Sequence, residues 1–126
     1  MGRAYGDNVR FIVDLPNRKS FSPDAAYYLG RRFRAKFLEG APAFAVEVRS
    51  QDDYGPRAEN EVAAKRRDYF AAGTLVVWDV DVLKSEVVRV YRASDPNSPK
   101  TYRRGELAEA ETAVPGWTMP VEDLFS

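Results

Sequence analysis

An apolar run that carries one carboxylate most constrains how this chain can fold. Residues 43–49 are almost continuously apolar, and Glu47 interrupts them. Such a run is typical of a central strand that is covered on both faces of a sheet. A pattern with helical spacing follows at 57–72, and a second apolar run follows at 74–80. Strand, helix and strand in this order predict a crossover unit with two parallel strands and a right-handed connection.

Hairpins are expected on both sides of this crossover unit. A strand at 9–15 is expected to pair antiparallel with a strand at 24–29, through a turn at 17–20. Residues 30–40 fit either a loop or a short helix. The elements after the helix are expected to be a returning strand at 85–91, a loop at 95–99, a short edge strand at 101–103 and a terminal helical turn at 121–125. Together these elements predict an α/β fold, a mixed β-sheet with one main helix packed on it, in a single domain over residues 1–126.

Composition excludes several kinds of catalytic site. The chain has no cysteine and no histidine, which excludes disulfides, the usual zinc sites and Ser-His-Asp or Cys-His triads. Chemistry must therefore use carboxylates, lysine, arginine or hydroxyl groups, and carboxylates favour hard cations such as Mg²⁺ or Mn²⁺. No apolar run is long enough to span a membrane and no secretory signal opens the chain, so a cytoplasmic protein without membrane contact is expected.

The charge balance is less informative. The 19 basic and 19 acidic side chains give a formal net charge of zero, and a neutral domain is not an obvious nucleic-acid binder. Cations do cluster at 31–36 and 65–67. A solvated surface is the simpler interpretation of each cluster taken alone.

Two carboxylates and one lysine form the candidate site. Asp24 follows a proline at the start of an expected strand, Glu47 lies within the apolar run, and Lys65 lies on the inward face of the expected helix. Mg²⁺ is commonly held by one or two carboxylates, which leaves positions for water and phosphate. Asp24 and Glu47 would be those metal ligands, and Lys65 would orient an attacking water or stabilise phosphate oxygens.

Each candidate also has a simpler interpretation. Asp24 could be an ordinary turn or capping residue. Glu47 could form an ion pair with Arg49, two residues along the same strand face, because a buried carboxylate needs a partner. Lys65 could extend its ammonium group past the core into solvent. We expect instead that Asp24 and Glu47 converge within one metal-coordination shell, and that Lys65 rather than Arg49 serves the site.

A series of motifs runs through the chain from about residue 6 to its end. They are Pro23-Asp24, Glu47-Val48-Arg49-Ser50, Lys65 with Tyr69 and Gly73, Val77-Trp78-Asp79-Val80-Asp81, Val88-Arg89-Val90-Tyr91, Val114-Pro115-Gly116-Trp117 and Val121-Glu122-Asp123-Leu124-Phe125. As a set, these motifs resemble the Uma-two family of restriction endonucleases, within the PD-(D/E)XK nuclease superfamily. The resemblance implies a restriction-endonuclease-like fold with Asp24 and Glu47 as metal-binding acids.

The chain departs from the superfamily pattern at one catalytic position. The commonest pattern places a lysine two residues after the second acid, and Arg49 stands there in this chain. Arginine stays protonated and does not act as a base. Members of the Uma-two family supply the lysine from the following helix, which corresponds to Lys65. Asp53 matches an acidic loop position to which the resemblance assigns no role.

The resemblance also bears on assembly. Members of the family usually begin with a further segment that includes a helix, so this chain is short at its N-terminus by comparison. Missing cover over apolar surface is expected to favour a homodimer or higher oligomer.

The function expected from these residues is a Mg²⁺-dependent or Mn²⁺-dependent DNA endonuclease that hydrolyses phosphodiester bonds. The presence of Asp24, Glu47 and Lys65 together favours this function. One alternative is a nuclease fold without activity that serves as a DNA-binding or interaction module, and another is a structural, dimerising fragment. DNA is the expected partner.

Overall fold

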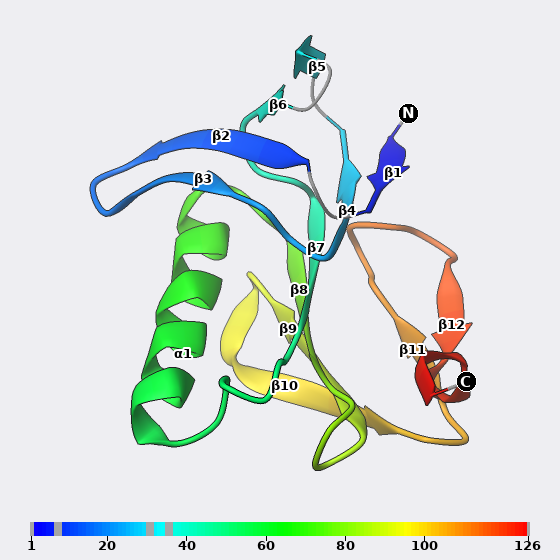
Figure 1. The fold of residues 1–126 in the computed structure, drawn as a ribbon. Helices are drawn as coiled ribbons and strands as arrows, with labels where there is room; N and C mark the ends of the chain where they lie inside the picture. Colours follow the sequence, from blue (N-terminus) through cyan, green and yellow to red (C-terminus); the bar gives the residue numbers. More distant parts are fainter. Residues whose placement is uncertain (1, 7–8, 30–31, 35–36, 126) are drawn as a thin grey trace.

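A six-stranded mixed sheet forms the centre of the molecule (Figure 1). The computed structural model describes residues 2–6, 9–29, 32–34 and 37–125. The sheet has the order β1-β4-β7-β8-β9-β10. Its strands are β1 (Arg3–Tyr5), β4 (Ala25–Tyr28), β7 (Phe44–Val48), β8 (Val76–Asp81), β9 (Val87–Arg92) and β10 (Asp95–Arg103). β7 and β8 are parallel and the other neighbours are antiparallel, so the predicted mixed sheet is confirmed.

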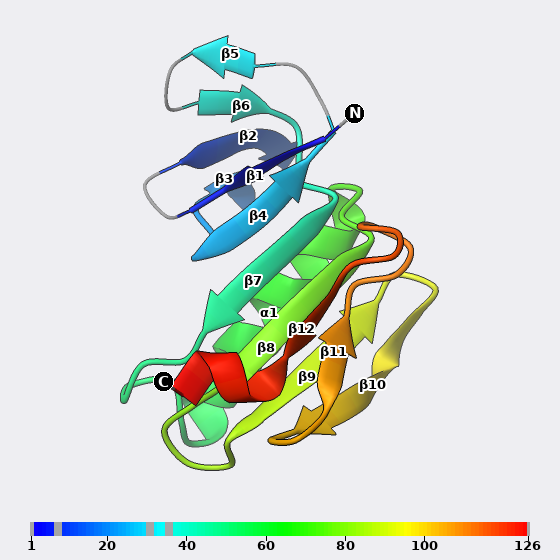
Figure 2. The same ribbon diagram turned by 90° about the vertical axis from the view of Figure 1, so that its right-hand side faces the viewer.

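The helix α1 (Pro56–Ala71) connects β7 to β8. It covers one face of the sheet. The C-terminal segment, residues 107–125, lies on the opposite face (Figure 2). Pro56 is the first residue of the helix. Its missing backbone N–H costs nothing there, because the N–H groups of the first turn have no acceptor within the helix. Gly73 follows the helix with a φ of +108°, a conformation that glycine adopts without strain. The predicted crossover unit with one main helix is therefore present.

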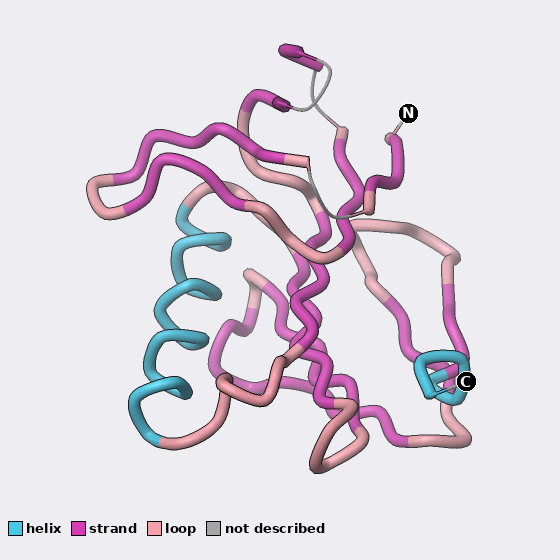
Figure 3. Tube along the Cα trace, in the orientation of Figure 1, coloured by secondary structure: helices cyan, strands magenta, loops and turns pink. Residues whose placement is uncertain are grey.

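The other described helical segment is η1 (Val121–Phe125), a 3₁₀-helix at the predicted terminal turn (Figure 3). It follows a small sheet of β11 (Leu107–Glu109) and β12 (Thr118–Pro120). Neither described helix has the length and apolar character needed to cross a membrane.

A second sheet has the order β3-β2-β6-β5. Its strands are β2 (Arg10–Leu15), β3 (Arg18–Phe21), β5 (Arg32–Arg34) and β6 (Phe37–Glu39). The hairpin of β2 and β3 reaches over one end of α1 (Figure 1). This placement brings the hairpin, which lies between β1 and β4 in the sequence, against α1.

The predicted N-terminal hairpin was wrong in its pairing. Its turn occupies only residues 16–17, and the polar residues after it form β3, which is the true partner of β2. The strand predicted at 24–29 is present as β4, but it pairs with β1 and β7. β3 is hard to detect from the sequence because Phe21 is its one fully buried side chain.

Two further segments also differ from the prediction. The loop predicted at 95–99 is the first half of β10, and the two prolines are tolerated because β10 is an edge strand with an irregular register there. The described parts of residues 30–40 contain the strands β5 and β6 instead of a helix or a loop alone.

Apolar side chains pack on both faces of the central sheet. Along β8, Val77 belongs to the cluster on the helix side, and Trp78 belongs to the cluster on the opposite side. Trp78 stacks there on Trp117 with 5.3 Å between ring centroids. Because successive strand residues point to opposite faces, burial along the whole of β8 requires both layers.

Glu109 joins the C-terminal segment to the edge of this sheet. Its carboxylate accepts hydrogen bonds from Arg92, from the Tyr102 hydroxyl at 2.8 Å and from the Glu111 backbone N–H at 2.8 Å. Burial alone would raise the pKa of Glu109, but the hydrogen bonds from Arg92, Glu111 and Tyr102 outweigh it and the pKa is lowered. The ionised form is therefore the one that stabilises the fold.

We expect Glu109→Gln to lower the free energy of unfolding at pH 7 by about 1–2 kcal/mol, the usual worth of hydrogen bonds to a charged group that is partly exposed. The loss should shrink as the pH falls below the ordinary glutamate pKa of 4.5, because the folded-state pKa lies lower and the wild-type carboxylate then becomes protonated as well. Urea unfolding at pH 7 and at pH 3 measures this, with exposed Asp52→Asn as the control. A loss that is equal at both pH values would contradict the assignment.

Candidate functional site

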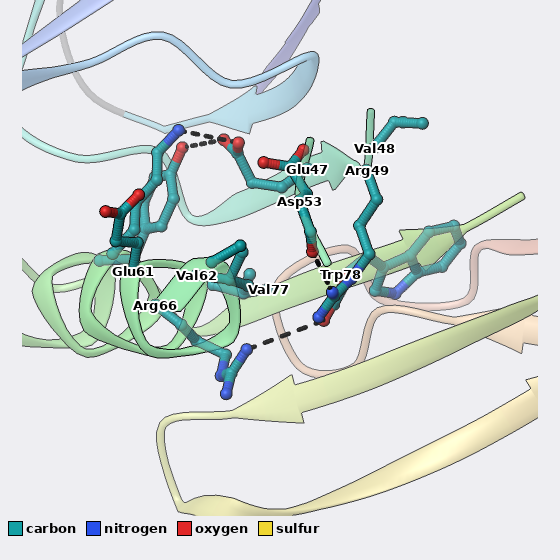
Figure 4. A pocket seen from close by; sticks show the side chains of 13 residues that line it. Glu47, Val48, Arg49, Asp53, Glu61, Val62, Arg66, Val77 and Trp78 are labelled. Atoms are coloured by element: carbon teal, nitrogen blue, oxygen red, sulfur yellow. Dashed lines mark hydrogen bonds and ion pairs between the residues drawn. The ribbon is translucent and has the colours of Figure 1, made fainter. Parts of the chain in front are cut away.

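Glu47 is held by two donors from the helix. It is the penultimate residue of β7, and its side chain lies on the face of the sheet that α1 covers. The Lys65 ammonium nitrogen lies 2.8 Å from Glu47 Oε1, and the Tyr69 hydroxyl oxygen lies 2.6 Å from Glu47 Oε2. Figure 4 shows the two contacts as dashed lines at the Glu47 carboxylate. The structure therefore brings the predicted Lys65 to Glu47, and it adds a tyrosine that sequence reasoning did not assign to the site.

Tyr69 approaches Glu47 from the core. The residue is 0% exposed, and its ring stacks on Phe21 with 4.0 Å between centroids. Burial, and after it the neighbouring Glu47 charge, raise the pKa of Tyr69, so the hydroxyl keeps its proton and donates. The signal in the sequence was its position four residues after Lys65, because residues at that spacing share one face of a helix.

Asp24 lies beside the same strand end as Glu47. Its backbone N–H donates to the Val46 carbonyl at 2.9 Å, and its carboxylate accepts from the Val48 backbone N–H at 2.7 Å. After burial and Glu47, the Asp24 charge also raises the pKa of Tyr69. Asp24 directly precedes β4, which pairs with β7, the strand of Glu47. The convergence of the two carboxylates on one metal ion stays a prediction.

Arg49 does not pair with Glu47, so the simpler interpretation of Glu47 was wrong. The guanidinium instead binds Asp79 through Nε and one terminal nitrogen, at 2.8 Å each. It also contacts the Glu59 carboxylate at 2.5 and 2.8 Å and the Asp53 carbonyl at 2.7 Å. Hydrogen bonds to Asp79 and Glu59 raise the pKa of Arg49 further, so it remains a cation. Arg49 therefore ties β7, β8 and the start of α1 together.

Asp53 shapes the loop between β7 and α1. Its carboxylate accepts hydrogen bonds from the Ser50 backbone N–H at 2.7 Å and the Ser50 hydroxyl at 3.1 Å. These contacts close a short turn, and they explain an acidic residue at this position without catalysis.

A pocket of about 200 Å³ lies between the end of β7, the following loop and the inner face of α1. Glu47, Asp53, Glu61 and Lys65 contribute polar groups to its lining, and Asp24 does not line it. Figure 4 shows the labelled side chains around this space, with Glu47 and Arg66 at opposite ends. A volume of this size has room for a small hydrated cation or a phosphate group.

The donor set fits a hard cation. Asp24 and Glu47 offer oxygen atoms alone, and each oxygen of Glu47 meets one donor, which leaves a second lone pair on each. Among the residues that the structure describes, no group of three or more acidic side chains forms a metal cluster. Two carboxylates with open positions suit Mg²⁺, which keeps several waters and binds phosphate.

The chain is similar to a known protein family and to a solved structure. The family model described as "Uma2: Putative restriction endonuclease" matches residues 1–122. A crystal structure of a protein from Anabaena variabilis ATCC 29413, titled as a putative nuclease belonging to DUF820, superposes with a TM-score of 0.73 at 20% identity. The match covers 98% of this chain and 68% of that one, and it shows that the fold is shared. Comparison with curated proteins found no match.

Proposed function

Since this chain belongs to the Uma2 family, the Uma-two family of the sequence resemblance, we propose that it is a Mg²⁺-dependent endonuclease that hydrolyses phosphodiester bonds in DNA. The observation that carries this proposal is the Glu47 carboxylate, which is oriented by Lys65 and Tyr69 at the wall of an open pocket. A carboxylate placed inside an apolar strand is costly, and a functional role accounts for its presence.

Each proposed site residue has a distinct task. Asp24 and Glu47 would hold the cation by one carboxylate each. Bound Mg²⁺ would polarise a phosphoryl oxygen and lower the pKa of a coordinated water. Lys65 donates from a compact ammonium group, so it can hold an attacking water or a phosphate oxygen next to Glu47. Mn²⁺ has the same preference for oxygen ligands and should substitute.

The second candidate is a nuclease fold without activity that binds DNA. The formal net charge of zero favours it mildly, because a neutral domain attracts the DNA backbone weakly. A homodimer or higher oligomer remains the expected assembly for either candidate function. Light scattering at micromolar concentrations measures it, and a monomer at every concentration would contradict it.

We expect Asp24→Asn and Glu47→Gln each to reduce Mg²⁺-dependent cleavage of DNA by at least about 100-fold, because each removes a charged metal ligand. Binding of DNA without metal should persist in both variants. Cleavage of a plasmid substrate with added Mg²⁺ or Mn²⁺ tests this, and exposed Glu122→Gln is the matched control. Wild-type protein that binds DNA but does not cleave it with either metal would favour the second candidate.

A further inference from the structure

Tyr69 meets the candidate metal ligand from the buried side. Its hydroxyl donates to Glu47 Oε2 at 2.6 Å, and the Lys65 ammonium donates to the other carboxylate oxygen at 2.8 Å. We propose that Tyr69 is a positioning residue that fixes the Glu47 carboxylate in the orientation that binds the metal ion. This inference rests on the proposed function, and it assigns a task to a residue outside the Asp24, Glu47 and Lys65 set.

The two donors to Glu47 differ in stiffness. The Lys65 side chain is 32% exposed, and a lysine reaches its partner through a long flexible stem. Tyr69 is 0% exposed and its ring is enclosed by the core. The rigid donor therefore sets where the carboxylate points, and the flexible donor can follow it. Groups that hydrogen-bond a metal ligand without contacting the metal commonly change the metal affinity in this way.

The support for Tyr69 comes from the β2–β3 hairpin. Phe21 stacks on the Tyr69 ring at an interplanar angle of 14°. At the other end of β3, Arg18 Nε donates to Asp68 at 2.9 Å, and the Asn17 side-chain amide donates to the same carboxylate at 3.1 Å. Asp68 immediately precedes Tyr69 on α1, so the hairpin binds the helix at the residue next to the tyrosine. Because Phe21 contacts the face of the Tyr69 ring and the hairpin also binds Asp68, the Tyr69 ring is expected to be held in place.

A simpler interpretation reverses the dependence. A buried tyrosine hydroxyl needs a hydrogen-bond partner, and in this interpretation Glu47 serves only as that partner. In that case Tyr69 would contribute to stability alone, and its hydroxyl would not affect metal binding. The two interpretations differ in the metal affinity of a variant that keeps the ring and loses the hydroxyl.

The test is Tyr69→Phe, titrated with Mg²⁺ and with Mn²⁺ by calorimetry in the absence of DNA. The ring still stacks on Phe21, so the fold should persist, and circular dichroism with a thermal melt checks this. We expect the dissociation constant for the metal to rise by about 10–100-fold. Tyr102→Phe is the matched control, because it removes a hydroxyl that donates at 2.8 Å to Glu109, outside the pocket lining.

The outcomes separate the two proposals. A wild-type protein that binds neither metal would overturn the proposed function and this inference with it. Metal binding by wild type that is lost in Glu47→Gln but unchanged in folded Tyr69→Phe would overturn the role of Tyr69 alone. Phe21→Leu gives a second measurement, since it keeps the hydroxyl and removes the stacked ring. It should weaken metal binding in the same direction but less, and an unchanged affinity would contradict the support from the hairpin.

Discussion

Replacing Lys65 with alanine is expected to reduce metal-dependent DNA cleavage by about 10²–10³-fold, the usual cost of losing one preorganised donor at a reacting centre. The ammonium group lies 2.8 Å from Glu47 at the wall of the pocket. Among the described residues, it is the cation that forms an ion pair with the Glu47 carboxylate. Single-turnover cleavage of a labelled duplex at saturating Mg²⁺ measures the effect on the chemical step.

The fold should persist in Lys65→Ala. The Lys65 side chain is about one-third exposed, and ion pairs of that exposure contribute about 0–1 kcal/mol to stability. Glu47 also keeps its hydrogen bond from Tyr69. Exposed Lys100→Ala, on the edge strand, is the matched control and should cleave normally. Normal cleavage by folded Lys65→Ala would refute the role given to the lysine.

The crossover unit could be predicted because its signals are local. Residues 43–49 and 74–80 are apolar runs of strand length, and the segment between them has helical spacing with glycine after its end. The structure places β7, α1 and β8 within one to two residues of these limits. The inward face of the helix could be read from the same spacing, so contact between Lys65 and Glu47 was open to prediction.

Pairing between distant segments could not be predicted in the same way. The β2–β3 hairpin docks on α1 through Asn17 and Arg18, which bind Asp68 about fifty residues later. Nothing in the local pattern of those polar residues distinguishes a docked hairpin from an exposed turn. The role of Phe21 as the stacking partner of Tyr69 depends on that docking and was therefore hidden as well.

The partner of Arg49 was missed for a related reason. Strand alternation places Arg49 on the face of Glu47, which made an ion pair between them plausible. The parallel register of β7 and β8 then sets Asp79 opposite Glu47. Asp79 is 3% exposed and needs a cation more than the partly exposed Glu47 does. Which carboxylate pairs with Arg49 therefore depends on the neighbouring strand β8. The alternation of side chains within β7 carries no information about that strand.

Arg49 is consequently expected to be a determinant of stability. Its guanidinium makes five hydrogen bonds to described residues, which join β7 to Asp79, Glu59 and the Asp53 carbonyl. Arg49→Ala would leave the Asp79 carboxylate buried without its two hydrogen bonds from Arg49, and with Arg66 still 3.9 Å away. We expect a loss of about 3–5 kcal/mol in the free energy of unfolding, as is usual when one member of a buried pair is removed.

Arg49→Lys should also destabilise the protein, although less than Arg49→Ala. A lysine keeps the positive charge, but it cannot reproduce the planar fork that meets two carboxylates and a carbonyl at once. The double variant Arg49→Met with Asp79→Leu should lose less than Arg49→Ala, because it removes both buried charges and leaves neither one unpaired. Urea unfolding of the three variants at pH 7 measures these differences. Suppose instead that the free energy of unfolding of Arg49→Ala lay within about 1 kcal/mol of the wild-type value. The buried network would then not hold the end of β7 against β8 and α1, and Arg49 would again be a candidate site residue.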